Sequence, residues 1–306
     1  MIKFISFFSL LFILNSCNND DPGDVVLSSE EINVTGTKYA ESKNNFANTY
    51  STFIDSLNAN DAITIVAEVD HAANARSTGR VLNPTKIVFF GNPVLGTPLM
   101  QKNQLAGLDL PQKVLFFQNS NNTVYAIYNS VPYLESRYNL QGVSTLSKIS
   151  TALENLTKAA TSSEIQRATN LSAEFKEGII TIESNQDFET THNTLQNAIV
   201  TNENLSIVAQ LDHQANAASV GLELRPTKII IFGNPNLGSP LMQNKQTIGL
   251  DLPQKMLVWQ SEDGMVNISY NDPVFLASKH QIEGNEDVVL QISTALETLA
   301  NTAAGN

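Results

Sequence analysis

Short runs of alternating apolar and polar residues, and longer stretches with helical spacing, follow one another along this chain. Alternation over 63–69 and over 205–211 predicts half-buried strands, because successive side chains of a strand point to opposite faces. Apolar residues recur at helical spacing over 46–57 and 188–199, which predicts amphipathic helices. The same succession of patterns occurs twice, and it predicts two units built alike.

The repetition extends to the residues themselves, at a constant offset of 142 positions. Residues 84–113 and 226–255 are identical at 22 of 30 positions, and the offset holds without a gap over 36–142 of the first copy. A period of this length is far above that of solenoid repeats, so the chain is predicted to hold two domains rather than stacked repeats.

The domain organisation that we predict follows from these patterns. The first repeat domain covers 34–160, and the second covers 176–306. Residues 161–175 are polar, lack an apolar stripe and are expected to form the linker. Residues 1–16 are predicted to be a signal peptide, and 17–33 a polar tether.

Within each repeat, the predicted order is strand, helix, four strands and a final helix, with a short helix near 98–104. Asn44 and Asn185 are expected to be N-caps. Asp272 followed by Pro273 predicts another helix start, with the proline in the first turn. Helices that cover one face of a largely antiparallel sheet are the architecture that such an order favours. The predicted fold class is therefore α+β, in two similar β-α-β(4)-α domains, each with its sheet backed by helices.

Composition narrows the class of protein. Hydrophobic residues make up 42% and charged residues 16% of the 306 residues, as in a globular protein. The formal net charge is −12, and lysine and arginine do not gather into a cluster, so no nucleic-acid partner is expected. The acidity is interpreted as an aid to solubility.

The N-terminus has the pattern of an export signal. Lys3 precedes an apolar run over 4–14, which is too short to span a bilayer. The sequence LNSC at 14–17 follows and resembles the bacterial lipobox, which implies that Cys17 becomes the lipidated N-terminus. Cys17 is also the only cysteine, so no disulfide competes for it. We predict a cell-envelope lipoprotein that a lipid holds to the membrane, facing the periplasm or the cell surface; the alternative is a secretory signal with an incidental cysteine.

Polar residues that recur in both repeats near strand ends are the candidate binding residues. An Asp-His pair ends the alternating strand of each repeat, and the histidine continues the phase that faces the core. A histidine, a lysine and an aspartate from three segments can form an anionic-ligand site or an acid–base pair, so we expect them to converge around a cavity. The candidates are His71, Lys86, Asp109 and Tyr128 in the first repeat, and His213, Lys228, Asp251 and Tyr270 in the second.

Each candidate also has a purely structural interpretation. The histidine can bond a backbone carbonyl at the edge of the core, the lysine can lie in a solvated salt bridge, and the tyrosine can pack in the core. Met100 and Met242 with the histidines would also suit copper or haem, but methionine beside leucine and proline is more often core packing. No metal and no cofactor are therefore predicted.

A loop rich in glycine and proline occurs at 91–100 and again at 233–242. Proline fixes the backbone and glycine allows unusual torsion angles, so the loop is expected to be stiff and shaped. Shaped loops often present binding sites. The known glycine patterns of phosphate-binding loops are not present in it.

Four motifs in one order carry a family resemblance: DHxxNA at 70–75, FGNPxLGxPLM at 90–100, GLDLP at 107–111 and YNDP at 270–273. Together they resemble the bacterial and archaeal domain-of-unknown-function family 302. The resemblance implies a small α+β domain with a sheet backed by two helices and frequent dimerisation, so that a tandem pair would form an intramolecular pseudo-dimer. It implies no reaction. The first repeat departs from the last motif at 130–132.

The function that these observations favour is binding. A lipid-tethered protein with twin domains, a stiff loop and no recognised catalytic motif is expected to hold a small molecule or a protein partner. The alternatives are a structural envelope protein without a ligand, and an enzyme that uses the histidine, lysine and aspartate of each repeat.

Overall fold

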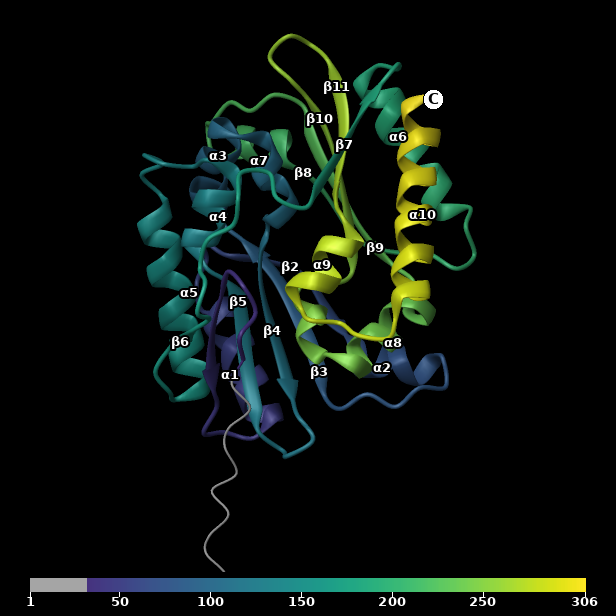
Figure 1. Ribbon diagram of the computed structural model, residues 1–306. Coiled ribbons are helices and arrows are strands. Elements are labelled where there is room, and N and C mark those ends of the chain that lie inside the picture. The colour runs from purple at the N-terminus through teal and green to yellow at the C-terminus, as the bar shows by residue number, and fades with distance from the viewer. Residues whose placement is uncertain (1–31) are drawn as a thin grey trace, which may run out of the picture. The chain divides into compact units, whose positions relative to one another are not determined.

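The computed structural model describes residues 32–306 (Figure 1). The predicted signal peptide, Cys17 and all but the end of the predicted tether lie outside the described residues. The strands of the first repeat are β1 (Thr37–Glu41), β2 (Thr64–Asp70), β3 (Thr85–Gly91), β4 (Gln112–Gln118) and β5 (Val124–Asn129). Its helices are α1 (Phe46–Asn58), α2 (His71–Ser77), α3 (Pro93–Lys102), the 3-10 helix η1 (Gln104–Asp109), α4 (Val131–Tyr138) and α5 (Leu146–Thr161).

The second repeat contains the same succession of elements. Its strands are β7 (Ile179–Ser184), β8 (Ser206–Asp212), β9 (Thr227–Gly233), β10 (Gln254–Gln260) and β11 (Val266–Asn271). Its helices are α6 (Phe188–Val200), α7 (His213–Ser219), α8 (Pro235–Asn244), the 3-10 helix η2 (Gln246–Leu250), α9 (Pro273–Lys279) and α10 (Glu286–Ala304). Between the repeats lies the short strand β6 (Gln166–Arg167).

Each repeat folds into its own antiparallel sheet. The strand order is β2-β3-β4-β5-β1-β6 in the first sheet and β7-β11-β10-β9-β8 in the second. Helices α1 and α5 pack against the first sheet, and α6 and α10 pack against the second. The predicted α+β class, with five strands in each repeat, is confirmed. The segment that we expected to be a linker adds β6 to the first sheet, where it pairs with β1.

The helix starts follow the local chemistry, with two corrections. The N-cap of α1 is Asn45 rather than Asn44, and that of α6 is Asp187 rather than Asn185. Asn44 instead donates its side-chain amide to the carbonyl of Ala160, so it holds the end of α5 and not the start of α1. The other predicted start is confirmed, because the Asp272 side chain caps α9, which begins at Pro273.

In each repeat one helix was placed wrongly and others were missed, among them the 3-10 helices η1 and η2 and, in the first repeat, α4. The short helix expected near 98–104 begins earlier, as α3, where Asn92 is the N-cap and Pro93 opens the first turn. Pro98 lies inside α3, so the predicted start was taken from the wrong proline. Helix α2 was not predicted. It follows β2 without a loop, because the side chain of Asp70 accepts a hydrogen bond from the backbone N–H of Ala73.

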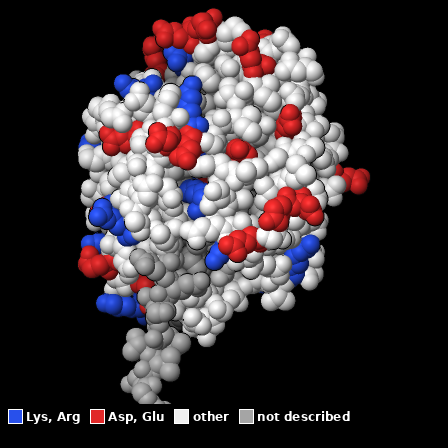
Figure 2. All heavy atoms as spheres, viewed as in Figure 1, with Lys and Arg blue, Asp and Glu red and all other residues white. Residues whose placement is uncertain are grey.

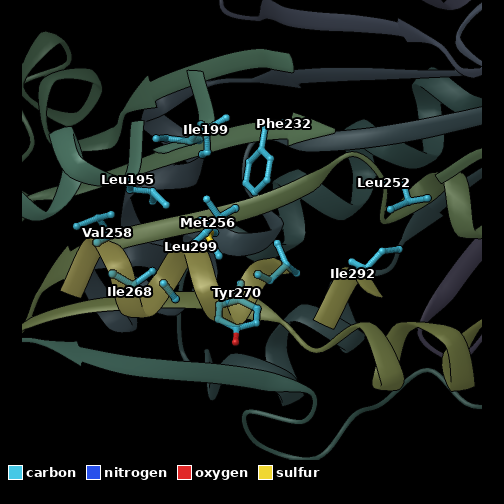
Figure 3. Packing of buried hydrophobic residues seen from close by; sticks show 14 of the residues in the cluster. Leu195, Ile199, Phe232, Leu252, Met256, Val258, Ile268, Tyr270, Ile292 and Leu299 are labelled. Atoms are coloured by element: carbon cyan, nitrogen blue, oxygen red, sulfur yellow. The ribbon is translucent and has the colours of Figure 1, made fainter. Parts of the chain in front are cut away.

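The main core of each repeat lies between its sheet and its two long helices. Figure 3 shows that of the second repeat, where side chains of α6 and α10 meet those of β9, β10 and β11. Leu195 of α6 and Met256 of β10 are fully buried there. Burial of one such side chain contributes about 1.5–3 kcal/mol, so this layer supplies a large share of the stability. Ala72 and Ala75 of α2 also belong to this cluster, so the first repeat helps to close the core of the second.

The opposite faces of the two sheets meet each other. Ile87 and Leu115 of the first sheet pack with Ile231 and Leu250 of the second repeat. Both faces of each sheet are therefore buried in part. This explains why β3, β4, β9 and β10 are nearly continuous apolar runs and not alternating ones.

Polar contacts across this interface come in matching pairs. The amide of Gln104 donates to Thr227 Oγ1 at 2.9 Å, and the equivalent amide of Gln246 donates to Thr85 Oγ1 at 2.8 Å. Gln101 likewise donates to a carbonyl of the second repeat, and its equivalent Gln243 to one of the first. Such reciprocity is the mark of an interface with two-fold symmetry.

Candidate functional site

The glycine- and proline-rich segment that we expected to be a loop is mostly helix, α3 in the first repeat and α8 in the second, because an asparagine caps each helix and a proline opens its first turn. In each repeat this segment forms one wall of a pocket. In the first repeat, Gly91, Asn92 and Pro93 lead from β3 into α3 and line a cavity of about 450 Å3. Ile65 of β2 and Leu153 of α5 contribute further apolar wall. A cavity of this volume is in the range that holds small molecules. We call it the first pocket.

The first pocket is completed by the second repeat. Asp212, His213 and Asn216, which belong to the DHxxNA motif of the second repeat, line it together with Gln210. The motif lies here because the side chain of Asp212 accepts a hydrogen bond from the backbone N–H of Ala215 and so starts α7 at His213.

The second pocket is built in the reciprocal way. Its walls come from Phe232, Leu237 and Leu296 of the second repeat, and its volume is about 230 Å3. His71 and Asn74 of the first repeat line it. Each Asp-His motif therefore contributes to the pocket of the other repeat, and neither repeat supplies a complete pocket by itself.

The two histidines have different contacts. His71 Nε2 lies 3.2 Å from the carbonyl oxygen of Gly249 in the second repeat. His213 Nε2, in contrast, has no hydrogen-bond partner among residues 32–306. Burial lowers the pKa of both imidazoles to about 4, so both are neutral at pH 7. The side chain of His213, which lines the larger of these two pockets, thus carries a neutral buried nitrogen that has no partner in this range.

A second polar group of the first pocket is also without a partner. The side-chain amide nitrogen of Gln112, at the start of β4, is buried and makes no hydrogen bond within the described part of the chain. Gln112 lines the first pocket with His213. An unpartnered buried N–H costs about 1–3 kcal/mol. A ligand that accepts a hydrogen bond from it would recover that free energy.

The predicted lysines lie elsewhere. Lys86 pairs with Asp70 across β2 and β3 at 3.3 Å, and both side chains are about one-third exposed. Lys228 pairs with Glu189 at 2.8 Å and lies 3.9 Å from Asp212. Neither lysine lines the first or the second pocket. Both lysines are therefore in partly exposed ion pairs, which is the structural alternative given above for these residues. Such pairs contribute little stability.

The predicted aspartates are buried between the repeats, where they form a network of ion pairs. Asp109 accepts hydrogen bonds from Lys113 at 2.9 Å, from Arg137 at 3.0 Å and from the hydroxyl of Tyr138 at 2.7 Å. The nearby charges of Lys113 and Arg137 outweigh burial and hold the pKa of Asp109 well below its usual range. Asp109 is therefore ionised at all ordinary pH values.

Asp251 has the equivalent surroundings in the second repeat. It accepts from Lys279 at 2.9 Å and from Lys113 of the first repeat at 3.1 Å, and His280 Nε2 lies 2.9 Å from it. Lys279 and Lys113 hold its pKa well below the usual range despite burial. Two amides close the network across the interface, because Arg137 donates to Asn271 and Lys279 donates to Asn129.

The expected convergence is therefore not what the structure shows. His71 lies at the second pocket, Lys86 is in a cross-strand pair at the surface, and Asp109 is in the buried network. Sequence reasoning did not identify the basic partners of the aspartates. The signal was present in Arg137 and Lys279, which are basic residues at equivalent positions in both copies.

The predicted tyrosines are core residues. Tyr128 belongs to the apolar cluster between the first sheet and its helices, and Tyr270 to that of the second (Figure 3). Burial raises the pKa of Tyr270 to about 12. Neither tyrosine lines a pocket described above.

Two further observations concern residues 32–306 alone. None of the helices in this range has both the length and the apolar character needed to cross a bilayer. Within it, His, Asp and Glu side chains do not form a group of three that could hold a metal ion.

On the face viewed in Figure 2, lysine and arginine are interspersed with aspartate and glutamate.

The chain thus consists of two similar α+β units in tandem, and each unit completes a pocket of the other. The chain belongs to the family described as domain of unknown function DUF302, which matches residues 38–161 and 180–299. The family resemblance carried by the four motifs, three of which occur in both repeats, is thereby confirmed.

Named relatives share one part of the chain. This chain is 38% identical over 130 residues to "Fluoride-specific ion channel FluC 1" of Brucella suis biovar 1 (strain 1330). The match covers 42% of this chain and 51% of the relative. The protein of the same name from Brucella abortus biovar 1 (strain 9-941) matches at the same identity, over 48% of its length. The chain thus spans about half the length of these curated relatives.

A solved structure is also similar, the "Crystal structure of uncharacterized conserved protein DUF302 from Bacillus stearothermophilus". The sequence identity is 18% and the TM-score is 0.38, over 42% of this chain and 98% of that chain.

Proposed function

We propose that this protein binds a small, largely apolar and uncharged molecule in the first pocket. The observation that carries the proposal is the pair of residues His213 and Gln112, which line one apolar cavity and each carry a buried nitrogen without a partner in the described residues. Ligand sites commonly combine an apolar wall with a few polar groups that fix orientation. The proposed ligand carries a carbonyl or hydroxyl group, which can form a hydrogen bond with the Gln112 amide or the His213 imidazole.

The charge of the ligand follows from the groups around the pocket. The carboxylate of Asp212 lines it, and the imidazole of His213 is neutral at pH 7 because burial lowers its pKa to about 4. An anionic ligand would be repelled by the Asp212 carboxylate, and no lysine or arginine lines the pocket to offset this, because Lys228 lies 3.9 Å from Asp212 but outside the lining. An uncharged ligand avoids this repulsion.

The binding test uses Nile red, an uncharged and largely apolar dye with a carbonyl group. Wild-type protein is expected to bind it with a blue-shifted emission. Gly96→Leu should abolish this binding, because Gly96 lines the first pocket and a Cβ there makes only ordinary contact with Leu110. Gly238→Leu is the matched control, since it makes the same change at the second pocket. Equal binding by wild type and Gly96→Leu, or no binding by wild type, would refute the proposal.

Two further variants test the polar contact that the proposal assigns to His213. His213→Phe removes the unpartnered nitrogen and keeps a ring of similar shape, so it should weaken Nile red binding about tenfold, as loss of one hydrogen bond worth about 1.4 kcal/mol would. His71→Phe is the matched control at the second pocket, where the nitrogen already faces Gly249. A larger effect of His71→Phe than of His213→Phe would contradict the assignment.

We propose further that the protein acts as a lipoprotein of the cell envelope, with Cys17 as its lipid anchor and the tandem repeats as an intramolecular pseudo-dimer. The support is the lipobox-like sequence at 14–17 and, for the pseudo-dimer, the reciprocal contacts of Gln104 and Gln246. Labelled palmitate should enter the wild type and not Cys17→Ser, and Cys17→Ser should leave the membrane fraction. Equal membrane association of both proteins would refute the anchor.

A further inference from the structure

The buried network between the repeats contains more basic than acidic side chains. Its carboxylates are Asp109 and Asp251, and each is at most 3% exposed. Its basic members, all 7% exposed or less, are Lys113, Lys255, Arg137, Lys279 and His280. Buried charges are expected to be compensated, because an unpaired charge in a protein interior costs several kcal/mol.

Equivalent members of the network have equivalent partners, with one exception. Arg137 and Lys279 occupy the same position in the two repeats, and each pairs with the aspartate of its own repeat. The exception is the lysine pair. Lys113 contacts both aspartates, whereas Lys255 Nζ contacts neither, and its N–H groups have no acceptor among the described residues. The polar neighbour of Lys255 is Lys113, from whose ammonium group an uncharged Lys255 accepts a hydrogen bond.

The exception has a geometric cause. Lys113 lies 2.9 Å from Asp109 Oδ1 and 3.1 Å from Asp251 Oδ1. The symmetry between the repeats would offer Lys255 the same two oxygens. Lys113 occupies both oxygens, and Asp109 Oδ1 accepts from Asn129 as well. Lys255 therefore stays beside Lys113, and no carboxylate of residues 32–306 lies within 4.0 Å of its Nζ.

A positive surplus remains when Lys255 and His280 are counted as uncharged. Burial, together with the charge of Lys113, holds the pKa of Lys255 well below its usual range, and burial also lowers that of His280. Burial also lowers the pKa of Lys279, but its ion pair with Asp251 at 2.9 Å acts against this, so Lys279 is counted as charged. With Lys255 and His280 uncharged, three cations still face two carboxylates: Lys113, Arg137 and Lys279 against Asp109 and Asp251. Aromatic rings beside Arg137 and Lys279 stabilise these two cations through cation–π contacts, but the rings carry no net charge and do not reduce the surplus.

We propose that the network is a binding site for one compact inorganic anion, of the size of chloride, held beside Lys255 Nζ. One negative charge offsets this surplus of one. The ion must be compact because Lys255 and its neighbours are packed side chains with 4% exposure or less, apart from Lys279 at 7%. Lys255 supplies N–H donors that no carboxylate uses.

The direct test is a crystal of the full chain soaked in sodium bromide. An anomalous bromide peak within hydrogen-bonding distance of Lys255 Nζ is expected. Absence of a peak between the repeats, with bromide found only at the surface, would overturn the proposal. This measurement needs no variant, so it does not depend on whether a substituted protein folds.

The solution test compares sodium chloride with sodium gluconate at equal ionic strength. Chloride should raise the melting temperature of the wild type in a saturable manner, by about 3 °C or more, because an ion that binds only the folded state stabilises it. Lys255→Met should lose this shift, and Lys255→Arg should keep it because arginine retains donors. Lys228→Met, which removes a lysine from a surface ion pair, should keep the shift. A shift of equal size in Lys255→Met and wild type would overturn the proposal.

Discussion

Lys113 and Lys255 occupy equivalent positions in the two repeats, yet only Lys113 is paired. Its Nζ lies 2.9 Å from Asp109 Oδ1 and 3.1 Å from Asp251 Oδ1, whereas Lys255 Nζ pairs with no carboxylate of residues 32–306. The duplication therefore placed two ammonium groups beside one pair of oxygens. One of the two became the bridge between the repeats.

Removal of the two lysines should have opposite effects on stability. Lys113→Met leaves two buried carboxylates short of a donor, and we expect the free energy of unfolding to fall by about 3–5 kcal/mol. Lys255→Met replaces a buried amine that pairs with no carboxylate by an apolar side chain, and we expect a change between zero and a gain of about 4 kcal/mol. Urea unfolding at pH 7 in gluconate buffer measures both. Losses of similar size in the two variants would show that the lysines are equivalent after all.

The buried histidines predict how stability depends on pH. Burial lowers the folded pKa of His71 and His213 from 6.5 to about 4. Between these values the unfolded chain binds more protons than the folded one, so the free energy of unfolding falls as the pH drops from 6.5 to about 4. The full effect is up to about 3 kcal/mol for each histidine.

The matched variant for this prediction carries His71→Gln and His213→Gln together. It should show a flatter stability profile between pH 7 and pH 4 in urea unfolding. The aspartates of the network do not contribute in this window, because their folded pKa values are lowered and their stabilisation is lost only as the pH falls below about 4. An unchanged profile in the double variant would assign the pH dependence to other groups.

Gly178, which immediately precedes β7, lies against an aromatic ring of α9. It has φ of +61°, and a Cβ there would overlap the ring of Phe275. Gly221 has φ of +72° with nothing within 4 Å of a Cβ. Gly221→Ala should therefore lose only the roughly 1–2 kcal/mol that a left-handed backbone costs an L-residue. Gly178→Ala should lose at least about 2 kcal/mol more, because the ring must move. Thermal unfolding of both variants compares them, and equal losses would mean that the ring is easily displaced.

The strands could be predicted from the sequence because their apolar runs are a local property. Each sheet is buried on one face by its own helices and on the other by the partner repeat, and runs such as those of β3 and β9 carry that pattern in consecutive residues. Helix α2 could not be predicted in this way. It has seven residues, and its buried residues Ala72 and Ala75 face a core that belongs to the other repeat.

The sequence indicated some individual residues of the candidate site but not which residues they contact. The phase of the alternating strand indicated that His71 turns inward, and it is buried. Which core it enters is not encoded locally, because its partner Gly249 is 178 residues away in the chain. Asp109 was recognised from the repeat, but its partner Arg137 lies on another element, and no spacing rule connects a residue of η1 with one of α4. Contacts between segments that are remote in sequence decided both outcomes.

The dependence of each repeat on the other leads to the last prediction. A fragment of residues 32–175 would expose the sheet face that carries Ile87 and Leu115, and it would leave Arg137 without Asn271. An apolar patch of this kind drives association. We therefore expect the fragment to self-associate in sedimentation equilibrium, and to form a one-to-one complex when it is mixed with residues 176–306. Ile87→Lys places a charge on the exposed face and should prevent both associations. A monomeric wild-type fragment with a cooperative unfolding transition would show instead that the first repeat is independent.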